Sequence, residues 1–94
     1  MNADRLTVVV AAYDEAESLS PLHARIAAVL ESLRADRVDG RVLYVDDGSR
    51  DGTWNVLQAI AARDPRVSLL RLSRHFGKEA ALTAGLDQVT EGAA

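Results

Sequence analysis

The chain has 94 residues, of which 48% are hydrophobic and 27% are charged, and its net charge at pH 7 is −3. This balance is typical of one globular domain with a modest core, and without a basic tract we expect no nucleic-acid partner. The absence of cysteine excludes disulfides and thiolate metal sites. The longest strongly apolar run, residues 6–13, is far below the ~20 residues of a membrane helix, and residues 1–6 do not resemble a secretory signal.

The first expected element is a strand. Residues 5–12 (RLTVVVAA) form a continuous run rich in β-branched side chains, which is typical of a strand covered on both faces. Apolar residues then recur at helical spacing and predict a helix over residues 15–35. Its inward stripe is expected to consist of Leu19, Leu22, Ile26, Val29, Leu30 and Leu33. Asp14 lies three residues before Glu17, which resembles a capping box at the helix start.

The remaining elements alternate in the same way. We expect a turn at 36–40, a strand at 41–45, a helix at 53–63, a strand at 66–72 and a helix at 78–89. The side chains of the last helix that we expect to face the core are Ala81, Leu82, Leu86 and Val89. Phe76 and Trp54 are expected to pack against the core, and His23 to lie half exposed on the first helix without an assigned function.

The order β-α-β-α-β-α predicts an α/β fold, a three-layer sandwich around a parallel sheet with right-handed crossovers, formed by residues 1–94 as one unit. In such sheets ligands bind beyond the carboxyl ends of the strands. The loops 12–15, 46–51 and 73–78 therefore share the functional edge, and the turns at the opposite edge read as ordinary surface turns. If the strand order is 3-2-1, the first strand is an open edge, and we expect chains to self-associate or to fold marginally.

The segment VLYVDDGSRDGTW, residues 42–54, ends a buried strand in two adjacent carboxylates, Asp46 and Asp47, although each raises the cost of ionising the other. A carboxylate is purely a hydrogen-bond acceptor, so it suits the ring N–H of uracil or guanine, or the hydroxyls of a ribose. Gly48 and Gly52 allow positive φ and a close approach of the backbone to a ligand.

Turn formation is the simpler explanation for part of this segment. Asp, Ser and Gly favour turns, and Ser49, Asp51 or Thr53 could cap the next helix. Capping does not account for two acids at one strand end. We therefore assign Asp47 to ligand binding and leave Asp46 open between ligand binding and a hydrogen bond to its own turn.

The loop after the first strand holds further candidates. The ring of Tyr13 could stack on a base or pack beneath it, and Glu15 could contact the ligand or favour the helix start, so both alternatives stay open. Asp14 and Glu17 are better explained as helix-start residues. This loop, AAYDEAES, has no glycine, which excludes a dinucleotide fingerprint and a Walker loop.

The third loop carries the basic groups of this edge. Arg71, Arg74 and Lys78 could neutralise a diphosphate, and Gly77 would let the backbone come close to it. A solvated loop with scattered charge is the alternative. His75 could transfer protons near neutral pH, but a hydrogen-bonded structural role is the better expectation.

Three segments together carry a family resemblance, VVVAAYDEAESL, VLYVDDGSRDGTW and LSRHFGKEAALTAGLD. They are similar to successive motifs of the family 2 inverting glycosyltransferases with a GT-A fold. More narrowly, they resemble the polyprenyl-phosphate branch, which includes dolichyl-phosphate mannosyltransferase and bactoprenol glucosyltransferase. The first two motifs are common to the wider family, the third is more specific to this branch, and the match runs from Thr7 to Gln88.

The resemblance implies a UDP- or GDP-sugar donor and a polyprenyl-phosphate acceptor. Tyr13 and Glu15 match residues that line the nucleotide pocket, and Asp47 matches the aspartate that contacts the base. The implied nucleotide-sugar site comprises Ala12, Tyr13, Glu15, Asp46, Asp47, Gly48, Arg74, Gly77 and Lys78. The chain departs from the family pattern at Ala11, Asp14 and His75, which affects local loop geometry.

A larger departure is an absence. The family's Asp-X-Asp motif, which binds Mg²⁺ or Mn²⁺ and the donor diphosphate, belongs to the strand that would follow Ala94, and the catalytic base lies further on. The resemblance therefore implies the nucleotide-binding half of a longer glycosyltransferase, without catalytic residues or metal ligands of its own and inactive alone. The parent would act in cell-envelope or glycolipid biosynthesis at the cytoplasmic face of the membrane. The alternative is a stand-alone, non-catalytic nucleotide-binding or interaction module.

Overall fold

Strands and helices alternate along the chain in the predicted order. The computed structural model describes residues 4–93 and the side chains of residues 4–90, so residues 1–3 and 94 of the expected domain lie outside it. The elements are β1 (Asp4–Ala12), α1 (Ala16–Arg34), β2 (Val38–Asp46), α2 (Thr53–Arg63), β3 (Val67–Arg71) and α3 (Lys78–Ala93). Within this part of the chain no helix is both long and apolar enough to span a bilayer.

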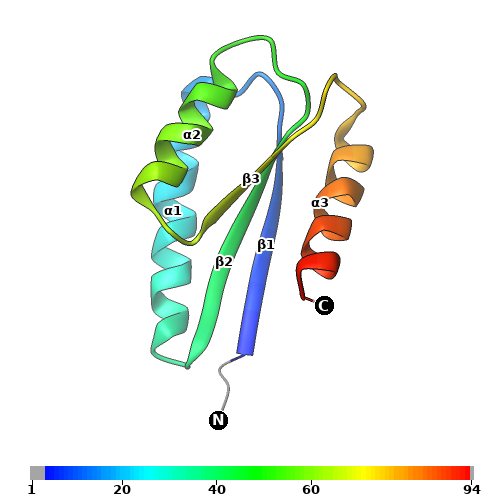
Figure 1. The fold of residues 1–94 in the computed structure, drawn as a ribbon. Coiled ribbons are helices and arrows are strands. Elements are labelled where there is room, and N and C mark those ends of the chain that lie inside the picture. Colours follow the sequence, from blue (N-terminus) through cyan, green and yellow to red (C-terminus); the bar gives the residue numbers. More distant parts are fainter. Residues whose placement is uncertain (1–3, 94) are drawn as a thin grey trace.

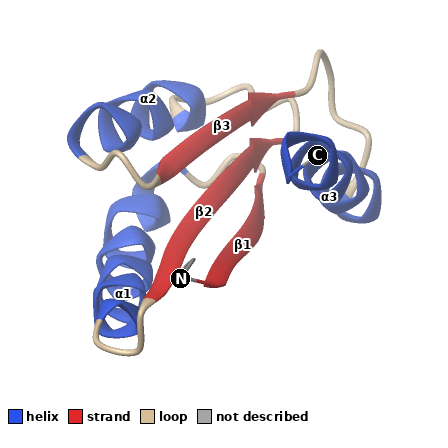
Figure 2. Ribbon diagram, turned by 60° about the horizontal axis from the view of Figure 1, so that its bottom comes forward, coloured by secondary structure: helices blue, strands red, loops and turns tan. Residues whose placement is uncertain are grey.

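The three strands form one parallel sheet in the order β1-β2-β3, so the strand order considered from the sequence is confirmed. Val42 of the central strand pairs with Val8 on one side and with Val67 on the other. Helices α1 and α2 lie on one face of the sheet and α3 lies on the other (Figure 1, Figure 2). The predicted three-layer α/β arrangement is therefore confirmed.

Strand β2 begins earlier than predicted. Residues 38–40 pair with residues 4–6 of β1, where the sequence predicts part of a turn at 36–40. Gly40 lets α1 lie close to this part of the strand, because an added Cβ atom would lie 2.9 Å from the Cδ2 atom of Leu30. The second half of the predicted turn is thus wrong, since ladder bonds and the contact with α1 extend the strand.

Two apolar layers hold the helices on the sheet. The buried cluster against α1 and α2 consists of Ala12, Leu19, Leu30, Val42, Tyr44, Leu57 and Ile60. The cluster against α3 consists of Leu43, Val45 and Ala81. Gly85 lets α3 come close, because an added Cβ would lie 2.6 Å from Val9 Cγ1 and 2.8 Å from Val45 Cγ2. Successive residues of β2 pack into opposite clusters, as in a strand buried on both faces.

Three apolar residues that the sequence places in the core are exposed. Leu86 is 57% exposed, Val29 is 56% exposed and Phe76 is 49% exposed. Leu86 follows the buried Gly85, and Val29 precedes the buried Leu30. Neighbouring side chains on a helix point about 100° apart, so each of these two residues points away from the sheet. These predictions are wrong because each helix contacts the sheet along a stripe narrower than its apolar spacing suggests. Phe76 is exposed because it lies in a loop beyond the sheet.

Strand β1 is an edge of the sheet within the described residues, where β2 is its only strand neighbour. Leu6 on this strand is 49% exposed. An open edge offers unpaired backbone groups to a second chain, so we expect the protein to self-associate as its concentration rises. We expect Leu6→Lys, which places a charge on the edge, to weaken the association constant by about tenfold or more in sedimentation velocity.

Val29→Lys is the matched control for this edge. Val29 is similarly exposed, at 56%, but it lies on α1. We expect this variant to associate as the wild type does. A wild-type protein that sediments as a monomer at every concentration would show that the edge does not pair.

Candidate functional site

The carboxyl ends of the three strands lie together, and the loops that follow them meet at one end of the molecule (Figure 1). Backbone hydrogen bonds continue the sheet into these loops. The N–H of Asp47 donates to the carbonyl of Ala12 at 2.9 Å, and the N–H of Leu72 donates to the carbonyl of Asp46 at 2.9 Å. The first residues of each loop are therefore fixed to one another.

Asp46 is fully buried and bonds its own turn. Its Oδ1 accepts the N–H of Ser49 at 3.0 Å. Its Oδ2 has no hydrogen-bond partner among the described residues, and the Nε of Arg71 lies 3.9 Å from it. The Arg71 guanidinium also lies over the ring of Trp54, 5.1 Å from the centroid, and Trp54 packs against the core as predicted. Of the two possibilities open for Asp46, the geometry supports the turn role.

Asp47 holds the loop that follows β3. Its carboxylate accepts the N–H of Phe76 at 2.9 Å and the N–H of Gly77 at 3.0 Å, one on each oxygen. The residue is only 2% exposed. Hydrogen bonds to a charged group contribute about 1.5–3 kcal/mol each, so this carboxylate is a firm clamp between β2 and residues 73–77.

Gly48 lets the second and third loops touch. Its φ is 71°, and a Cβ atom there would lie 2.2 Å from the carbonyl carbon of Arg74 and 2.4 Å from the nitrogen of His75. Glycine is needed on both counts. The sequence predicts a close backbone approach here, and the approaching group is the chain's own loop. Gly52, for which a positive φ is also considered, has a φ of −79°.

The side chain of His75 lies across Tyr13 and Asp47. Its Nδ1 is 3.0 Å from Oδ2 of Asp47 and 3.3 Å from the carbonyl oxygen of the same residue. Both oxygens are acceptors, so Nδ1 carries the hydrogen and donates it. The rings of His75 and Tyr13 are 3.9 Å apart between centroids, with their planes tilted by 33°. The hydrogen-bonded role expected of His75 is confirmed.

The helix starts are held by cross-loop bonds rather than by the predicted capping box. Asp14 has a φ of 49°, and its Oδ1 accepts the N–H of Arg50 at 2.8 Å. Asp51 accepts the N–H of Ala16 at 3.3 Å and the N–H of Thr53 at 2.8 Å, which ties the starts of α1 and α2 together. The hydrogen bond from the Thr53 hydroxyl lowers the pKa of Asp51. The capping box is therefore wrong, and the turn role of Asp51 is confirmed.

The remaining candidates are exposed at the same edge. Glu15 precedes α1, and Lys78 is the first residue of α3, next to the clamped Gly77. The guanidinium of Arg74 lies over the exposed ring of Phe76, 5.1 Å from its centroid. The structure thus places the aromatic ring of Tyr13 and the Asp47 carboxylate against the same side chain, that of His75, with cationic side chains nearby.

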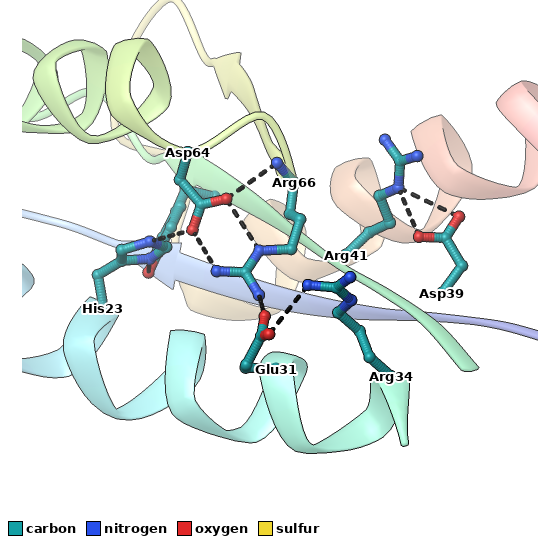
Figure 3. A network of polar contacts seen from close by, with 8 residues as sticks. His23, Glu31, Arg34, Asp39, Arg41, Asp64 and Arg66 are labelled. Atoms are coloured by element: carbon teal, nitrogen blue, oxygen red, sulfur yellow. Dashed lines mark hydrogen bonds and ion pairs between the residues drawn. The ribbon is translucent and has the colours of Figure 1, made fainter. Parts of the chain in front are cut away.

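A second polar network joins α1, β2 and the turn before β3 (Figure 3). His23 bonds the hydroxyl of Tyr44 through Nδ1 at 2.7 Å and Oδ2 of Asp64 through Nε2 at 3.0 Å. Arg66 donates to Asp64 at 2.9 Å and to Glu31 at 3.4 Å. The His23 side chain is only 12% exposed, so the predictions of a half-exposed histidine and an ordinary surface turn are wrong. The partners of His23 are 21 and 41 residues away in the sequence, so no local pattern indicates its burial.

This network gives a pH prediction. Hydrogen bonds from Arg66 hold the pKa of Asp64 well below its usual range, whereas burial raises the pKa of Tyr44 to about 12. The Tyr44 phenol ionises near pH 10 in the unfolded chain but at a higher pH in the folded protein. Its contribution to the free energy of unfolding is therefore complete below pH 10 and is lost as the pH rises toward 12. Near pH 11 we expect a loss of about 1.4 kcal/mol.

Urea unfolding of the wild type and of Tyr44→Phe, at neutral pH and near pH 11, measures this loss. The phenylalanine variant lacks the titrating group, so the stability of the wild type should fall by about 1.4 kcal/mol more than that of the variant. Parallel changes in the two proteins would rule out Tyr44 as the cause.

A divalent metal ion needs several ligands placed around one point. In residues 4–90, no group of three or more histidine, aspartate or glutamate side chains is placed to hold one. The buried carboxylates of Asp46 and Asp47 are bonded to backbone N–H groups instead. The described residues do not fit a metal ion, and we assign none to them.

Known proteins resemble this chain over most of its length. The family model described as Glycosyl transferase family 2 matches residues 7–92. The prophage bactoprenol glucosyl transferase homolog of Escherichia coli (strain K12) is 36% identical over 86 residues, which are 92% of this chain and 27% of that protein. The undecaprenyl-phosphate 4-deoxy-4-formamido-L-arabinose transferase of Pseudomonas fluorescens is 38% identical over 84 residues, which are 88% of this chain and 24% of that protein.

A solved structure extends the comparison to the fold. The mannosyltransferase PcManGT from Pyrobaculum calidifontis, in complex with GDP-Man and Mn²⁺, matches with a TM-score of 0.61 and 27% identity over 94% of this chain and 25% of that one. The chain spans about a quarter of the length of these relatives. Since the family model covers most of the chain, the resemblance carried by the three motifs is confirmed, and the chain belongs to glycosyl transferase family 2.

Proposed function

We propose that the chain binds and orients the nucleotide sugar in an inverting glycosyltransferase that moves a hexose from a UDP- or GDP-sugar to polyprenyl phosphate. The names of two similar proteins contain a lipid of this kind, bactoprenol or undecaprenyl phosphate. The similar mannosyltransferase was solved with GDP-Man. These names support a polyprenyl-phosphate acceptor and a nucleotide-sugar donor for the proposed parent enzyme.

The position of Tyr13 and Asp47 at the carboxyl edge of the sheet, where both contact His75, carries this proposal. An aromatic ring beside a carboxylate suits the flat face and the ring N–H of uracil or guanine. Arg74 and Lys78 are exposed on the adjoining loop and suit the two phosphates. Lys78 also opens α3, where the positive end of the helix attracts anions.

The chain's own contribution is binding rather than bond breaking. A Mg²⁺ or Mn²⁺ ion would neutralise the departing diphosphate in the parent enzyme. The described residues hold no cluster of three or more potential ligands for that ion, and from the family resemblance we propose that other parts of the parent enzyme supply the metal ligands, the catalytic base and the lipid site. We propose that the parent works at the cytoplasmic face of the membrane, where a nucleotide sugar meets a lipid phosphate.

Isothermal titration of the chain with UDP, GDP and CDP tests the proposal. UDP and CDP are a matched pair, because uracil has a ring N–H donor where cytosine has an acceptor. We expect UDP or GDP to bind at least about tenfold more tightly than CDP, since the cytosine acceptor would face the Asp47 carboxylate. Equal affinity for CDP, or no binding of UDP and GDP, would refute the proposed site.

A transfer assay tests where the chemistry lies. We expect the 94-residue chain to transfer no sugar from UDP-glucose or GDP-mannose to undecaprenyl phosphate. Turnover above the rate of a heat-denatured sample would show that catalytic groups lie within these residues.

A further inference from the structure

The imidazole of His75 makes both contacts that the proposed function assigns to a nucleotide base. It is a flat aromatic ring 3.9 Å from the ring of Tyr13, and its Nδ1 lies 3.0 Å from Oδ2 of Asp47. Uracil and guanine share these two properties, a flat face and a ring N–H. The side chain therefore occupies the position in which a base would meet the same two residues.

The Asp47 carboxylate cannot contact the His75 imidazole and a nucleotide base at the same time. Oδ2 accepts the N–H of Gly77 at 3.0 Å, and Nδ1 of His75 lies against the same oxygen, also at 3.0 Å. Oδ1 accepts the N–H of Phe76, and the whole residue is only 2% exposed. A ring N–H can therefore reach Oδ2 only after the imidazole has left it.

The imidazole can leave without breaking the clamp. The bonds from Phe76 and Gly77 come from the backbone, so they persist when only the side chain of His75 rotates. That side chain is 50% exposed, which gives it a direct path into solvent. Its departure costs a hydrogen bond to the Asp47 carbonyl oxygen, the contact with the Asp47 carboxylate and one ring contact, a modest free energy that a nucleotide must supply.

We propose that His75 is an internal competitor of the nucleotide, one that occupies the base subsite until a base displaces it. This inference rests on the proposed function. An occupied subsite lowers the apparent affinity by the fraction of molecules in which it is open, so the removal of the imidazole should strengthen binding. A histidine that helped to hold the base would give the opposite sign.

Titration of UDP and GDP into His75→Ala, His75→Phe and the wild type tests the competition. We expect His75→Ala to bind about three- to tenfold more tightly than the wild type. His75→Phe keeps a ring but loses the N–H donor, so it should lie between the two. Ser73→Ala, a change at an exposed position of the same loop, is the matched control and should bind as the wild type does. Equal or weaker binding by both His75 variants would overturn the competition and leave the proposed function standing.

Nuclear magnetic resonance of the protein before and after nucleotide is added separates the failure of the competition from the failure of the proposed function. In the ligand-free wild type we expect nuclear Overhauser contacts between the His75 and Tyr13 rings, and we expect UDP or GDP to remove them. Their absence from the free protein would overturn the inference whether or not nucleotide binds. If the contacts are present but neither nucleotide binds any of the proteins, the proposed function fails, and His75 is not a competitor.

Discussion

Substitution of Gly48 by alanine is expected to destabilise the protein by about 3 kcal/mol or more. The new Cβ would lie 2.2 Å from the carbonyl carbon of Arg74 and 2.4 Å from the nitrogen of His75, and the φ of 71° is itself unfavourable for a residue with a side chain. Both opposing atoms belong to the backbone, so no side-chain rotation relieves the overlap. The loop must move away, which stretches the bonds from Phe76 and Gly77 to Asp47. Urea unfolding monitored by circular dichroism measures the loss.

Gly52→Ala is the matched control for this substitution. No atom lies within 4 Å of the position of its added Cβ, and its φ of −79° suits any residue. Gly52 is the N-cap of α2, where alanine is less favourable than glycine, so a cost below about 1 kcal/mol is expected. Similar losses in both variants would mean that the contact between the two loops does not determine the effect.

The layered fold could be predicted because its signals are local. The apolar spacing after the acidic turn predicts a helix at 53–63, and α2 spans Thr53–Arg63. The continuous apolar run at 5–12 predicts a strand, and β1 spans Asp4–Ala12, although its first three residues are exposed and only Ala12 is buried, so the expected cover on both faces is wrong for most of this edge strand. The alternation of such elements then fixes which loops share the carboxyl edge. This is why Tyr13 and Asp47 could be assigned to one edge from the sequence.

The bonds within that edge could not be predicted, because their partners are distant or belong to the backbone. The N–H groups of Phe76 and Gly77 are 29 and 30 residues from Asp47, and a backbone group leaves no mark in the sequence. Asp14 shows how a local pattern misleads. Its spacing to Glu17 resembles a capping box, yet its carboxylate bonds the N–H of Arg50, so a contact between loops overrides the local preference.

Removal of the Asp47 carboxylate is the second large effect that we expect. Asp47→Ala leaves the N–H groups of Phe76 and Gly77 without their acceptor, at a cost of about 3 kcal/mol in the free energy of unfolding. Amide hydrogen exchange should become faster at these two residues first, because the clamp on their loop is lost. Asp36→Ala, at an exposed position in the turn between α1 and β2, should change neither quantity. Unchanged exchange at Phe76 and Gly77 in Asp47→Ala would refute the clamp.

The substitution Asp47→Asn separates the clamp from recognition of the base. An asparagine keeps one oxygen, which can still accept the N–H of Phe76, while its NH₂ group takes the place of Oδ2. That group repels the N–H of Gly77 and also the ring N–H of uracil, but it can donate to the ring acceptor of cytosine. We therefore expect a smaller stability loss than in Asp47→Ala, about 1–2 kcal/mol, together with a fall of at least about tenfold in the preference for UDP over CDP. A variant that is destabilised but keeps the wild-type preference would identify Asp47 as a clamp alone, because a residue in contact with the base cannot exchange an acceptor for a donor without changing which base is favoured.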